Sequence, residues 1–208
     1  MFDCVITAAG ASSRMGAPGG MAVLKPLLPF AGCTLVETAV HAALDASCRV
    51  ILVVGNRATE VASLFDAEAH RAAKDQGRLL VVENPGWERG LLGSIQVAIA
   101  AVEGEAFFLA HADMPFVDST AYHSLADVWT TAVQATATPT AILASHGGLR
   151  GHPVLLPSAW IPEMSTLDPR GRMWDFLVKK PMTLVETGPG ALRDIDTPGD
   201  YENAVEGS

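Results

Sequence analysis

Near its N-terminus the chain reads Val5-Ile6-Thr7-Ala8-Ala9-Gly10-Ala11-Ser12-Ser13-Arg14-Met15-Gly16. The first four residues form a short apolar run, which predicts a buried β-strand that ends before the glycine. The residues that follow are mostly small, and small side chains allow phosphate oxygens to approach backbone N–H groups closely. Arg14 then supplies a guanidinium that can form two parallel hydrogen bonds with a phosphate. The segment is therefore either a phosphate-binding loop or a flexible surface turn, and composition alone does not separate the two.

Outside this segment, short apolar runs alternate with amphipathic ones. We expect further strands at 50–54, 79–82, 106–110, 140–144, 154–156 and 182–185, and helices at 34–44, from about 59, at 94–102 and at 172–178. Thr34 followed by Glu37 predicts a capped start of the first helix. This alternation indicates βαβ units, so the sequence predicts an α/β, Rossmann-like fold with a mainly parallel sheet and helices on both faces. In such sheets, ligands bind beyond the carboxyl ends of the strands.

The overall composition is that of a globular protein. The chain has 208 residues, of which 49% are hydrophobic and 18% are charged, and we expect one domain spanning 1–208. The formal net charge of -9 argues against general binding to nucleic acid or to an acidic membrane surface. Local cations, backbone amides and a divalent metal can still hold a triphosphate on an acidic protein.

The cysteines and the N-terminus indicate a reducing compartment. Cys4, Cys33 and Cys48 form no CxxC pair, and their number is odd. The chain starts Met1-Phe2-Asp3-Cys4, without the basic start and apolar run of a signal peptide. No apolar run is long enough to span a bilayer. We therefore expect a cytoplasmic protein that is not bound to a membrane.

Lys25 favours the phosphate-binding interpretation of the N-terminal segment. It is the first lysine in the chain, and it lies between Leu24 and Pro26. An isolated lysine in such an apolar setting is suited to act as a point charge placed against phosphate. The glycine spacing matches neither the Rossmann G-x-G-x-x-G motif nor a P-loop, because no Gly-Lys-Ser/Thr follows. The sequence thus predicts a phosphate site of another type.

A second candidate loop follows the apolar run at 106–110 and reads His111-Ala112-Asp113-Met114-Pro115. The carboxylate of Asp113 can coordinate a divalent metal that bridges triphosphate oxygens. A turn or helix cap is the alternative role for Asp113. His111 can face the same pocket, although an ordinary polar role at a strand end is favoured for it.

Several motifs together resemble a known family. The loop from Ala8 to Gly16, followed by Lys25-Pro26-Leu27-Leu28-Pro29, resembles the signature of NTP-transferases (nucleotidyltransferases) with the fold of nucleotide-diphospho-sugar transferases. Within that group the chain looks most like the molybdenum-cofactor cytidylyltransferases, which join CMP from CTP to molybdopterin. Three later segments support this resemblance: Asp113-Met114-Pro115-Phe116-Val117, Arg150-Gly151-His152-Pro153 and Asp194-Ile195-Asp196-Thr197-Pro198-Gly199-Asp200-Tyr201.

The resemblance implies a set of site residues. Arg14, Lys25 and Asp113 would be catalytic, and Asp113 with Asp196 would hold Mg²⁺ or Mn²⁺. The nucleotide would contact Ala8, Ala9, Gly10, Ser12, Arg14, Gly16, Lys25, Asn84, Gly90 and Ser94. The acceptor would contact Gly151, His152 and Pro153. The implied partners are CTP or GTP, a phosphorylated pterin, and a molybdoenzyme as candidate recipient of the product.

Some of these roles have ordinary structural alternatives. Trp87 can stack on a base or simply pack beside Pro85. Ser94 can cap a helix rather than contact the nucleoside. Asp196 or Thr197 can cap the last helix, which would compete with metal binding by Asp196.

Three rival functions stay open. Phe116 is similar to the residue found in guanylyltransferases for the same cofactor. The interval between Arg14 and Lys25 is longer than in the cytidylyltransferase pattern and resembles that of nucleotidyltransferases acting on sugar or polyol phosphates. The third rival is a nucleotide-binding module without catalysis, which would bind CTP but release no pyrophosphate.

Overall fold

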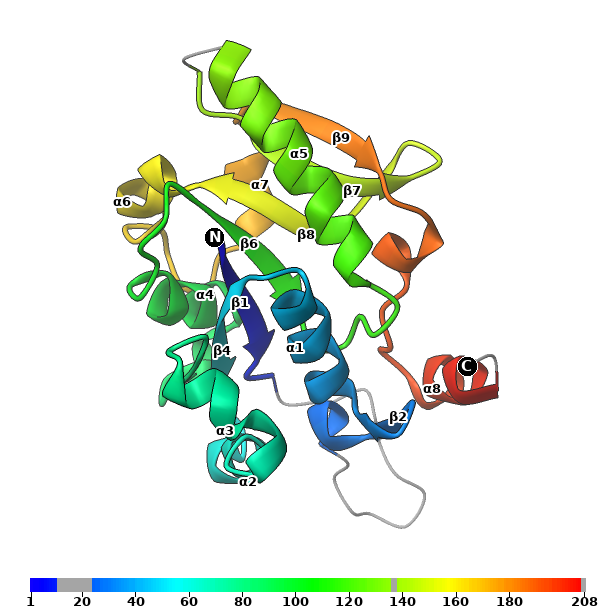
Figure 1. Ribbon diagram of the computed structural model, residues 1–208. Helices are drawn as coiled ribbons and strands as arrows, with labels where there is room; N and C mark the ends of the chain where they lie inside the picture. The colour runs from blue at the N-terminus through cyan, green and yellow to red at the C-terminus, as the bar shows by residue number, and fades with distance from the viewer. Residues whose placement is uncertain (11–23, 136–137, 207–208) are drawn as a thin grey trace.

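The computed structural model describes residues 1–10, 24–135 and 138–206, which form a seven-stranded sheet with helices packed on it (Figure 1). The strand order is β5-β4-β1-β6-β8-β7-β9. The strands are β1 (Asp3–Ala8), β4 (Arg49–Val54), β5 (Leu79–Glu83), β6 (Ala106–His111), β7 (Ala141–His146), β8 (Leu149–Pro157) and β9 (Met182–Glu186).

The sheet is mainly parallel, as the sequence predicts. Within the seven-stranded sheet of the described residues, β8 alone runs against its neighbours β6 and β7, and the other pairings are parallel. β8 begins at Leu149, whereas the sequence predicted a short strand at 154–156. The expected strand was too short because the polar segment before Val154 does not read as a buried run. The Arg150–Pro153 segment therefore lies within the sheet rather than in a loop.

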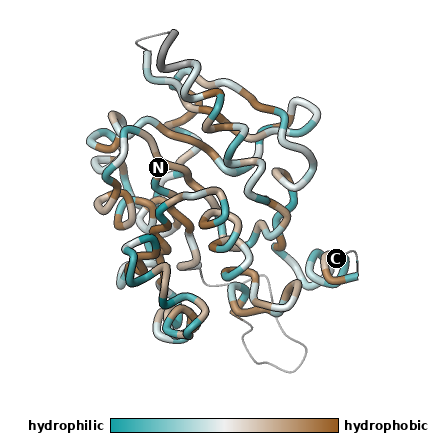
Figure 2. The backbone as a smooth tube through the Cα atoms, in the orientation of Figure 1, coloured by the Kyte–Doolittle hydropathy of each residue, from teal (hydrophilic) through white to brown (hydrophobic). Residues whose placement is uncertain are grey.

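Helices cover both faces of the sheet. Side chains alternate along β1, so that Cys4 and Ile6 join one core cluster and Val5 joins the other. The first cluster packs under α1 (Leu35–Asp45), α2 (Ala58–Leu64) and α5 (Ser119–Ala135); the second packs under α4 (Leu91–Ile99), α6 (Ile161–Met164) and α7 (Met173–Leu177). Figure 2 shows hydrophobic residues along the strands between these layers. The predicted α/β architecture is confirmed.

The start of α1 is the capping box that its sequence predicts. The Glu37 N–H donates to Thr34 Oγ1 at 3.4 Å, and the Thr34 N–H donates to Glu37 Oε2 at 2.9 Å. These reciprocal bonds satisfy two backbone donors that the first turn of a helix leaves without partners. The helix therefore begins at the expected place, directly after Thr34.

α4 begins earlier than expected. The sequence predicted a helix at 94–102, but α4 spans Leu91–Ile99 and follows a short 3₁₀ helix, η2 (Trp87–Arg89). Its N-cap is Gly90, whose φ of 116° lies in a region that favours glycine. Ser94 is thus inside the helix, and its predicted alternative role as the cap is wrong.

Smaller elements complete the described chain. η1 (Lys25–Leu27) leads into the hairpin of β2 (Pro29–Phe30) and β3 (Cys33–Thr34), and α8 (Pro198–Glu206) lies beside this hairpin (Figure 1). Tyr201 of α8 donates its hydroxyl to the carbonyl of Pro29 at 2.7 Å. Two more 3₁₀ helices are η3 (Ser158–Trp160) and η4 (Pro189–Leu192). Within the described residues, no helix has the length and apolar character that a membrane crossing needs.

Candidate functional site

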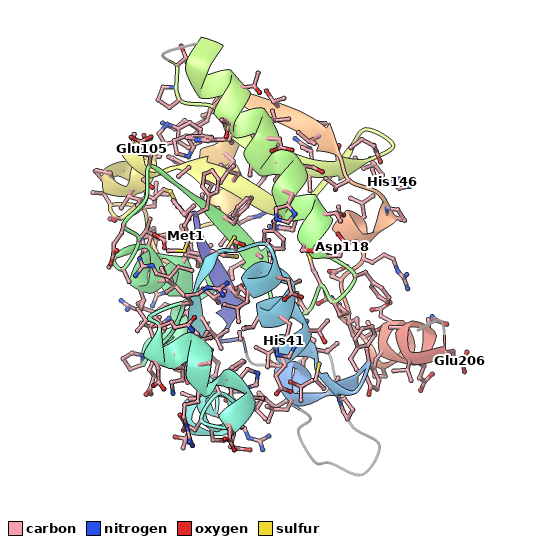
Figure 3. The ribbon with its side chains drawn as sticks, in the orientation of Figure 1. Met1, His41, Glu105, Asp118, His146 and Glu206 are labelled. Atoms are coloured by element: carbon pink, nitrogen blue, oxygen red, sulfur yellow. The ribbon has the colours of Figure 1, made fainter. Side chains whose placement is uncertain are left out.

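A cavity of about 750 Å³ opens at the carboxyl ends of β1 and β6. The two strands are parallel neighbours, and their register pairs Thr7 with His111. The residues that follow them, Ala9 and Gly10 after β1 and Ala112 and Asp113 after β6, line the cavity together. Figure 3 labels Glu105, which directly precedes β6, and Asp118, which follows the loop after the carboxyl end of that strand, the end at which the cavity opens. The two predicted loops are thus brought to one site.

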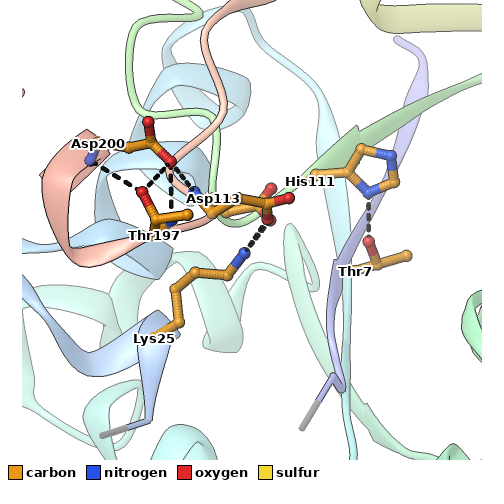
Figure 4. Close-up of polar contacts among 7 residues, drawn as sticks. Thr7, Lys25, His111, Asp113, Thr197 and Asp200 are labelled. Carbon is orange, nitrogen blue, oxygen red and sulfur yellow. Dashed lines mark hydrogen bonds and ion pairs between the residues drawn. The ribbon is translucent and has the colours of Figure 1, made fainter. Parts of the chain in front are cut away.

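Lys25 joins this site from η1. Its Nζ lies 2.6 Å from Asp113 Oδ2 (Figure 4) and 2.9 Å from Asp196 Oδ1. The Lys25 side chain is only 15% exposed. Burial by itself lowers the pKa of Lys25, but the two carboxylates outweigh that effect, so its pKa lies above the usual lysine value. The amine therefore stays an ammonium between the two carboxylates.

The two carboxylates fit a hard divalent cation that shares its ligands with a triphosphate. Oxygen ligands are those that Mg²⁺ and Mn²⁺ prefer, and Mg²⁺ is commonly held by one or two carboxylates plus substrate phosphates. Among residues 1–10, 24–135 and 138–206, no group of three or more His, Cys, Asp or Glu side chains is arranged to hold a metal ion. A cation held by Asp113 and Asp196 could share its ligands with substrate phosphates.

The segment before α8 delivers Asp196 to the site. The Ile195 N–H donates to the Asp113 carbonyl at 2.8 Å, and the Ile195 side chain is buried beside Phe30 and Leu35. The cap of α8 is Thr197, whose Oγ1 accepts a hydrogen bond from the Asp200 N–H at 3.2 Å (Figure 4). The Asp196 carboxylate is therefore directed to Lys25 instead of capping the helix.

Asp194 is a third carboxyl group of the cavity, which the sequence did not single out. Burial raises the pKa of Asp194, and the negative charges of Asp196 and Asp113 add to the effect. Its only sequence signal was its place two residues before Asp196 in the late motif.

Two histidines form a second polar part of the cavity wall. His111 Nδ1 lies 2.6 Å from Thr7 Oγ1 (Figure 4), and His152 Nδ1 lies 3.3 Å from the Leu109 carbonyl, to which it donates. The two rings meet edge to face, with centroids 4.2 Å apart. Burial lowers the pKa of His111 to about 4, with a contribution from the Lys25 ammonium. Burial also lowers the pKa of His152 to about 3, so both rings are neutral at physiological pH.

The segment after β5 forms another wall. Trp87, Gly90 and Ser94 line the cavity, and Ser94 Oγ accepts a hydrogen bond of 3.0 Å from Asn84 Nδ2. Asn84 is fully buried, and its Oδ1 accepts from the Gly86 N–H at 3.0 Å. The Asn84 amide is thus engaged in shaping the turn, and Ser94 lies between it and the cavity.

Trp87 serves as both packing and wall. A Cβ added to Gly55, just after β4, would lie 2.5 Å from Trp87 Cβ. Trp87 thus packs on the β4 end and also lines the cavity, so its packing role is confirmed, while stacking on a base stays a prediction.

The predicted acceptor segment lies beside the acidic residues. Arg150, Gly151 and His152 line the cavity, and Pro153 is buried behind them in β8. The predicted residues Ser12, Arg14 and Gly16 lie outside the described residues. Thr7, Met114 and Leu192 also line the cavity, but the sequence offered no pattern that would have picked them out.

Comparison with known proteins agrees with this geometry. The model of the MobA-like NTP transferase domain family matches residues 4–183. The molybdenum cofactor cytidylyltransferase of Escherichia coli (strain K12) is 32% identical over 206 residues, which cover 99% of this chain and 96% of that protein.

Solved structures share the fold. A nucleotidyl transferase from Methanothermobacter thermautotroptrophicus superposes with a TM-score of 0.78 at 24% identity, covering 100% of this chain and 97% of that one. Rv0371c from Mycobacterium tuberculosis H37Rv, in complex with manganese, gives a TM-score of 0.75 at 22% identity and covers 100% and 99% of the two chains. With a family match over most of its length and a curated relative over nearly all of it, the chain belongs to the MobA-like NTP transferases.

Proposed function

We propose that the protein is a cytidylyltransferase that transfers CMP from CTP to a phosphorylated pterin, with molybdopterin as the acceptor, and releases pyrophosphate. The activity named for the Escherichia coli relative supports this proposal, because the likeness extends over 99% of the chain. The family match supports the wider assignment to nucleotidyl transfer.

The observation that carries the proposal is the Lys25 ammonium between Asp113 and Asp196 at the carboxyl ends of β1 and β6. This partly buried site combines one cation with two carboxylates, so it can accept a triphosphate together with a divalent metal. The ammonium offers a charge to phosphate oxygens, and the carboxylates offer oxygens to a metal.

In the proposed reaction an oxygen of the acceptor phosphate forms a bond to the α-phosphorus of CTP. The bond from that phosphorus to the oxygen bridging to the β-phosphate breaks, and pyrophosphate leaves with the electron pair. Lys25 holds the triphosphate, and Arg14 is proposed from the sequence to assist it. Mg²⁺ or Mn²⁺ held by Asp113 and Asp196 would neutralise developing negative charge. Such transfer depends on positioning and electrostatics more than on side-chain acid–base chemistry.

The acceptor is proposed to lie against β8. Gly151 exposes backbone there, and the neutral rings of His111 and His152 offer hydrogen bonds without a net charge. This wall is suited to the uncharged heteroatoms of a pterin, while the Lys25 ammonium, together with a metal that Asp113 and Asp196 would hold, is suited to phosphate.

The residue shared with guanylyltransferases has a structural role here. The Phe116 ring packs edge to face on Phe30, with centroids 5.5 Å apart, and the Arg193 guanidinium lies 3.5 Å from its centroid. Phe116 is not among the residues that line the cavity. Its identity therefore does not favour GTP over CTP.

The test is a matrix of CTP, GTP, UTP and dTTP against molybdopterin cofactor, sugar 1-phosphates and polyol phosphates, with Mg²⁺ or Mn²⁺ and pyrophosphate release as the readout. The proposal expects release with CTP and the pterin. Release that requires GTP, or that requires a sugar or polyol phosphate, would assign the corresponding rival function. Tight CTP binding without release for any acceptor would indicate a non-catalytic module.

A further inference from the structure

The segment between β9 and α8 makes two unusually close backbone contacts. We call residues 188–196 the C-terminal strap; it contains η4 and ends with the cavity residues Asp194 and Asp196. Apart from these two carboxyl groups, the sequence of the strap shows no helical or strand pattern that would predict its function. Its packing shows how the acidic residues are held against the rest of the site.

The first close contact joins the strap to the loop after β6. A Cβ added to Gly190 would lie 2.1 Å from the carbonyl oxygen of Phe116 and 2.9 Å from its carbonyl carbon. These are backbone atoms, which cannot turn away as the end of a flexible side chain can. Gly190 therefore fits only because it lacks a side chain, and Phe116 is three residues after Asp113.

The second close contact joins the strap to β8. A Cβ added to Gly151 would lie 2.0 Å from the carbonyl oxygen of Ala191. A glycine inside a strand often marks a place where another backbone approaches closely. Two adjacent strap residues, Gly190 and Ala191, are thus wedged between the Asp113 loop on one side and the segment beside His152 on the other.

Further contacts hold the part of the strap that carries the two carboxyl groups. The Arg193 guanidinium stacks on the Phe116 ring, and the Ile195 N–H donates to the Asp113 carbonyl at 2.8 Å. Ala191 and Ile195 are 3% and 1% exposed, so the strap is anchored by burial on both sides of Asp194. The position of Asp196 relative to Lys25 and Asp113 is therefore set by how closely the strap docks.

We propose that Gly190 and Gly151 are positioning residues, whose missing side chains let the strap dock and so place Asp194 and Asp196 opposite Lys25 and Asp113. This inference rests on the proposed function, since it assigns those carboxyl groups to the nucleotidyl-transfer site. A Cβ at either position would push the strap outward, away from a site whose geometry the reaction needs. Displacement of a functional group by about 1 Å can cost 10²-fold in rate.

The test compares Gly190→Ala and Gly151→Ala with a matched control, Gly199→Ala, in the full chain. Gly199 lies just beyond the strap in α8, and a Cβ there would meet nothing closer than Thr197 Oγ1 at 3.9 Å. Three readouts are taken: hydrogen–deuterium exchange of peptides covering 189–197, the dissociation constant of Mn²⁺ in the presence of CTP, and kcat and KM for pyrophosphate release.

The proposal expects faster exchange confined to the strap in both test variants, Mn²⁺ affinity weakened by about tenfold, and a fall in kcat of about 100-fold. Gly199→Ala should change none of these. Native exchange and turnover in Gly190→Ala would overturn the proposal, and so would a loosened strap with unchanged kcat and Mn²⁺ affinity. Global unfolding of both test variants would assign the glycines to the fold as a whole and would also overturn it.

The same data separate this inference from the proposed function. Wild-type protein that binds Mn²⁺ with CTP but releases no pyrophosphate would contradict the proposed catalytic function. In that case the hydrogen–deuterium exchange and the Mn²⁺ affinity of the variants would still decide the role of the strap. Wild-type protein that neither releases pyrophosphate nor binds Mn²⁺ with CTP would overturn both.

Discussion

Lys25 and Asp113 are 88 positions apart in the chain, yet Lys25 Nζ lies 2.6 Å from Asp113 Oδ2. The contact arises because β6 is the parallel neighbour of β1, and because η1 places Lys25 at the carboxyl ends of these two strands. Asp196 lies on the other side of the ammonium, at 2.9 Å. In the proposed reaction the ammonium would exchange these carboxylates for phosphate oxygens, which would leave the carboxylates to a metal.

Asp113→Asn should lower kcat for pyrophosphate release by about 10²–10³-fold, the loss typical of removing one electrostatic group from an active site. The amide keeps the size of the side chain but loses the charge that would hold a divalent cation. Steady-state kinetics over a range of Mn²⁺ concentrations measures the effect. Asp66→Asn is the matched control, because Asp66 forms an exposed ion pair with Lys74 and should turn over normally. Near-normal turnover in Asp113→Asn would contradict a metal-binding role.

Lys25→Met should destabilise the fold by roughly 1.5–3 kcal/mol, the usual contribution of hydrogen bonds to a charged group. The change leaves Asp113 and Asp196 facing each other without the cation between them. The double variant Lys25→Met/Asp113→Asn should lose less than the sum of the single changes, because one of the facing charges is then gone.

Urea unfolding at neutral pH gives these free energies. The control is Lys74→Met, which breaks an exposed pair and should cost less than about 1 kcal/mol. Strict additivity of the Lys25 and Asp113 changes would show that the two groups do not interact energetically.

The site residues that could be predicted from the sequence are those in motifs that follow the predicted strands. Lys25 and Asp113 each follow a short apolar run or a small-residue loop, and a parallel sheet places the carboxyl ends of its strands at the same edge. Asp194 and Leu192 reach the same cavity through the docking of η4, which depends on Gly190 and Gly151. Close backbone contacts of this kind leave no repeating pattern of polar and apolar residues in the sequence, so only the three-dimensional structure reveals them.

The helices too differ in whether their local sequence predicts them. α1 begins where its capping box predicts, because Thr34 and Glu37 satisfy each other within four residues. α4 begins at Leu91, and its N-cap is Gly90, which has no side chain to form a capping hydrogen bond, so the start of this helix has no capping motif like that of α1. α5 was not predicted at all, although Ala121, Tyr122 and Leu125 are buried at helical spacing; threonine, histidine and valine in this segment have weak helix propensity, and tertiary packing outweighs it.

The pKa values of His111 and His152 predict a loss of stability in mild acid. Each pKa in the folded protein, about 4 and about 3, lies below the usual value near 6.5, so between these limits the unfolded chain binds protons that the folded chain does not. The free energy of unfolding therefore falls as the pH drops below about 6.5, with a slope of up to about 1.4 kcal/mol per pH unit from each histidine.

Urea unfolding at several pH values between about 4.5 and 7.5 tests this slope. His111→Gln and His152→Gln should each reduce it, whereas His123→Gln, at an exposed position on α5, is the control and should leave it unchanged. Carboxylates affect all variants alike, so the differences between slopes isolate the histidines. Equal slopes in all four proteins would show that neither ring is kept neutral by the fold.

Ser94→Ala separates the two roles that remain for this residue once helix capping is excluded. Ser94 accepts a 3.0 Å hydrogen bond from Asn84, and both residues are almost fully buried, at 2% and 0% exposed. Removing the hydroxyl leaves an Asn84 N–H without that partner, which should destabilise the fold by about 1–3 kcal/mol. A Ser94 hydroxyl that also contacts the nucleotide makes the variant raise KM for CTP in addition, while one that only supports Asn84 leaves KM unchanged.

Urea unfolding and steady-state kinetics on the same preparation distinguish these outcomes. The control is Ser124→Ala in α5, where the exposed hydroxyl donates to the Thr120 carbonyl. Unchanged stability in Ser94→Ala would contradict the supporting role, because a buried amide cannot lose a partner without cost unless another group replaces it.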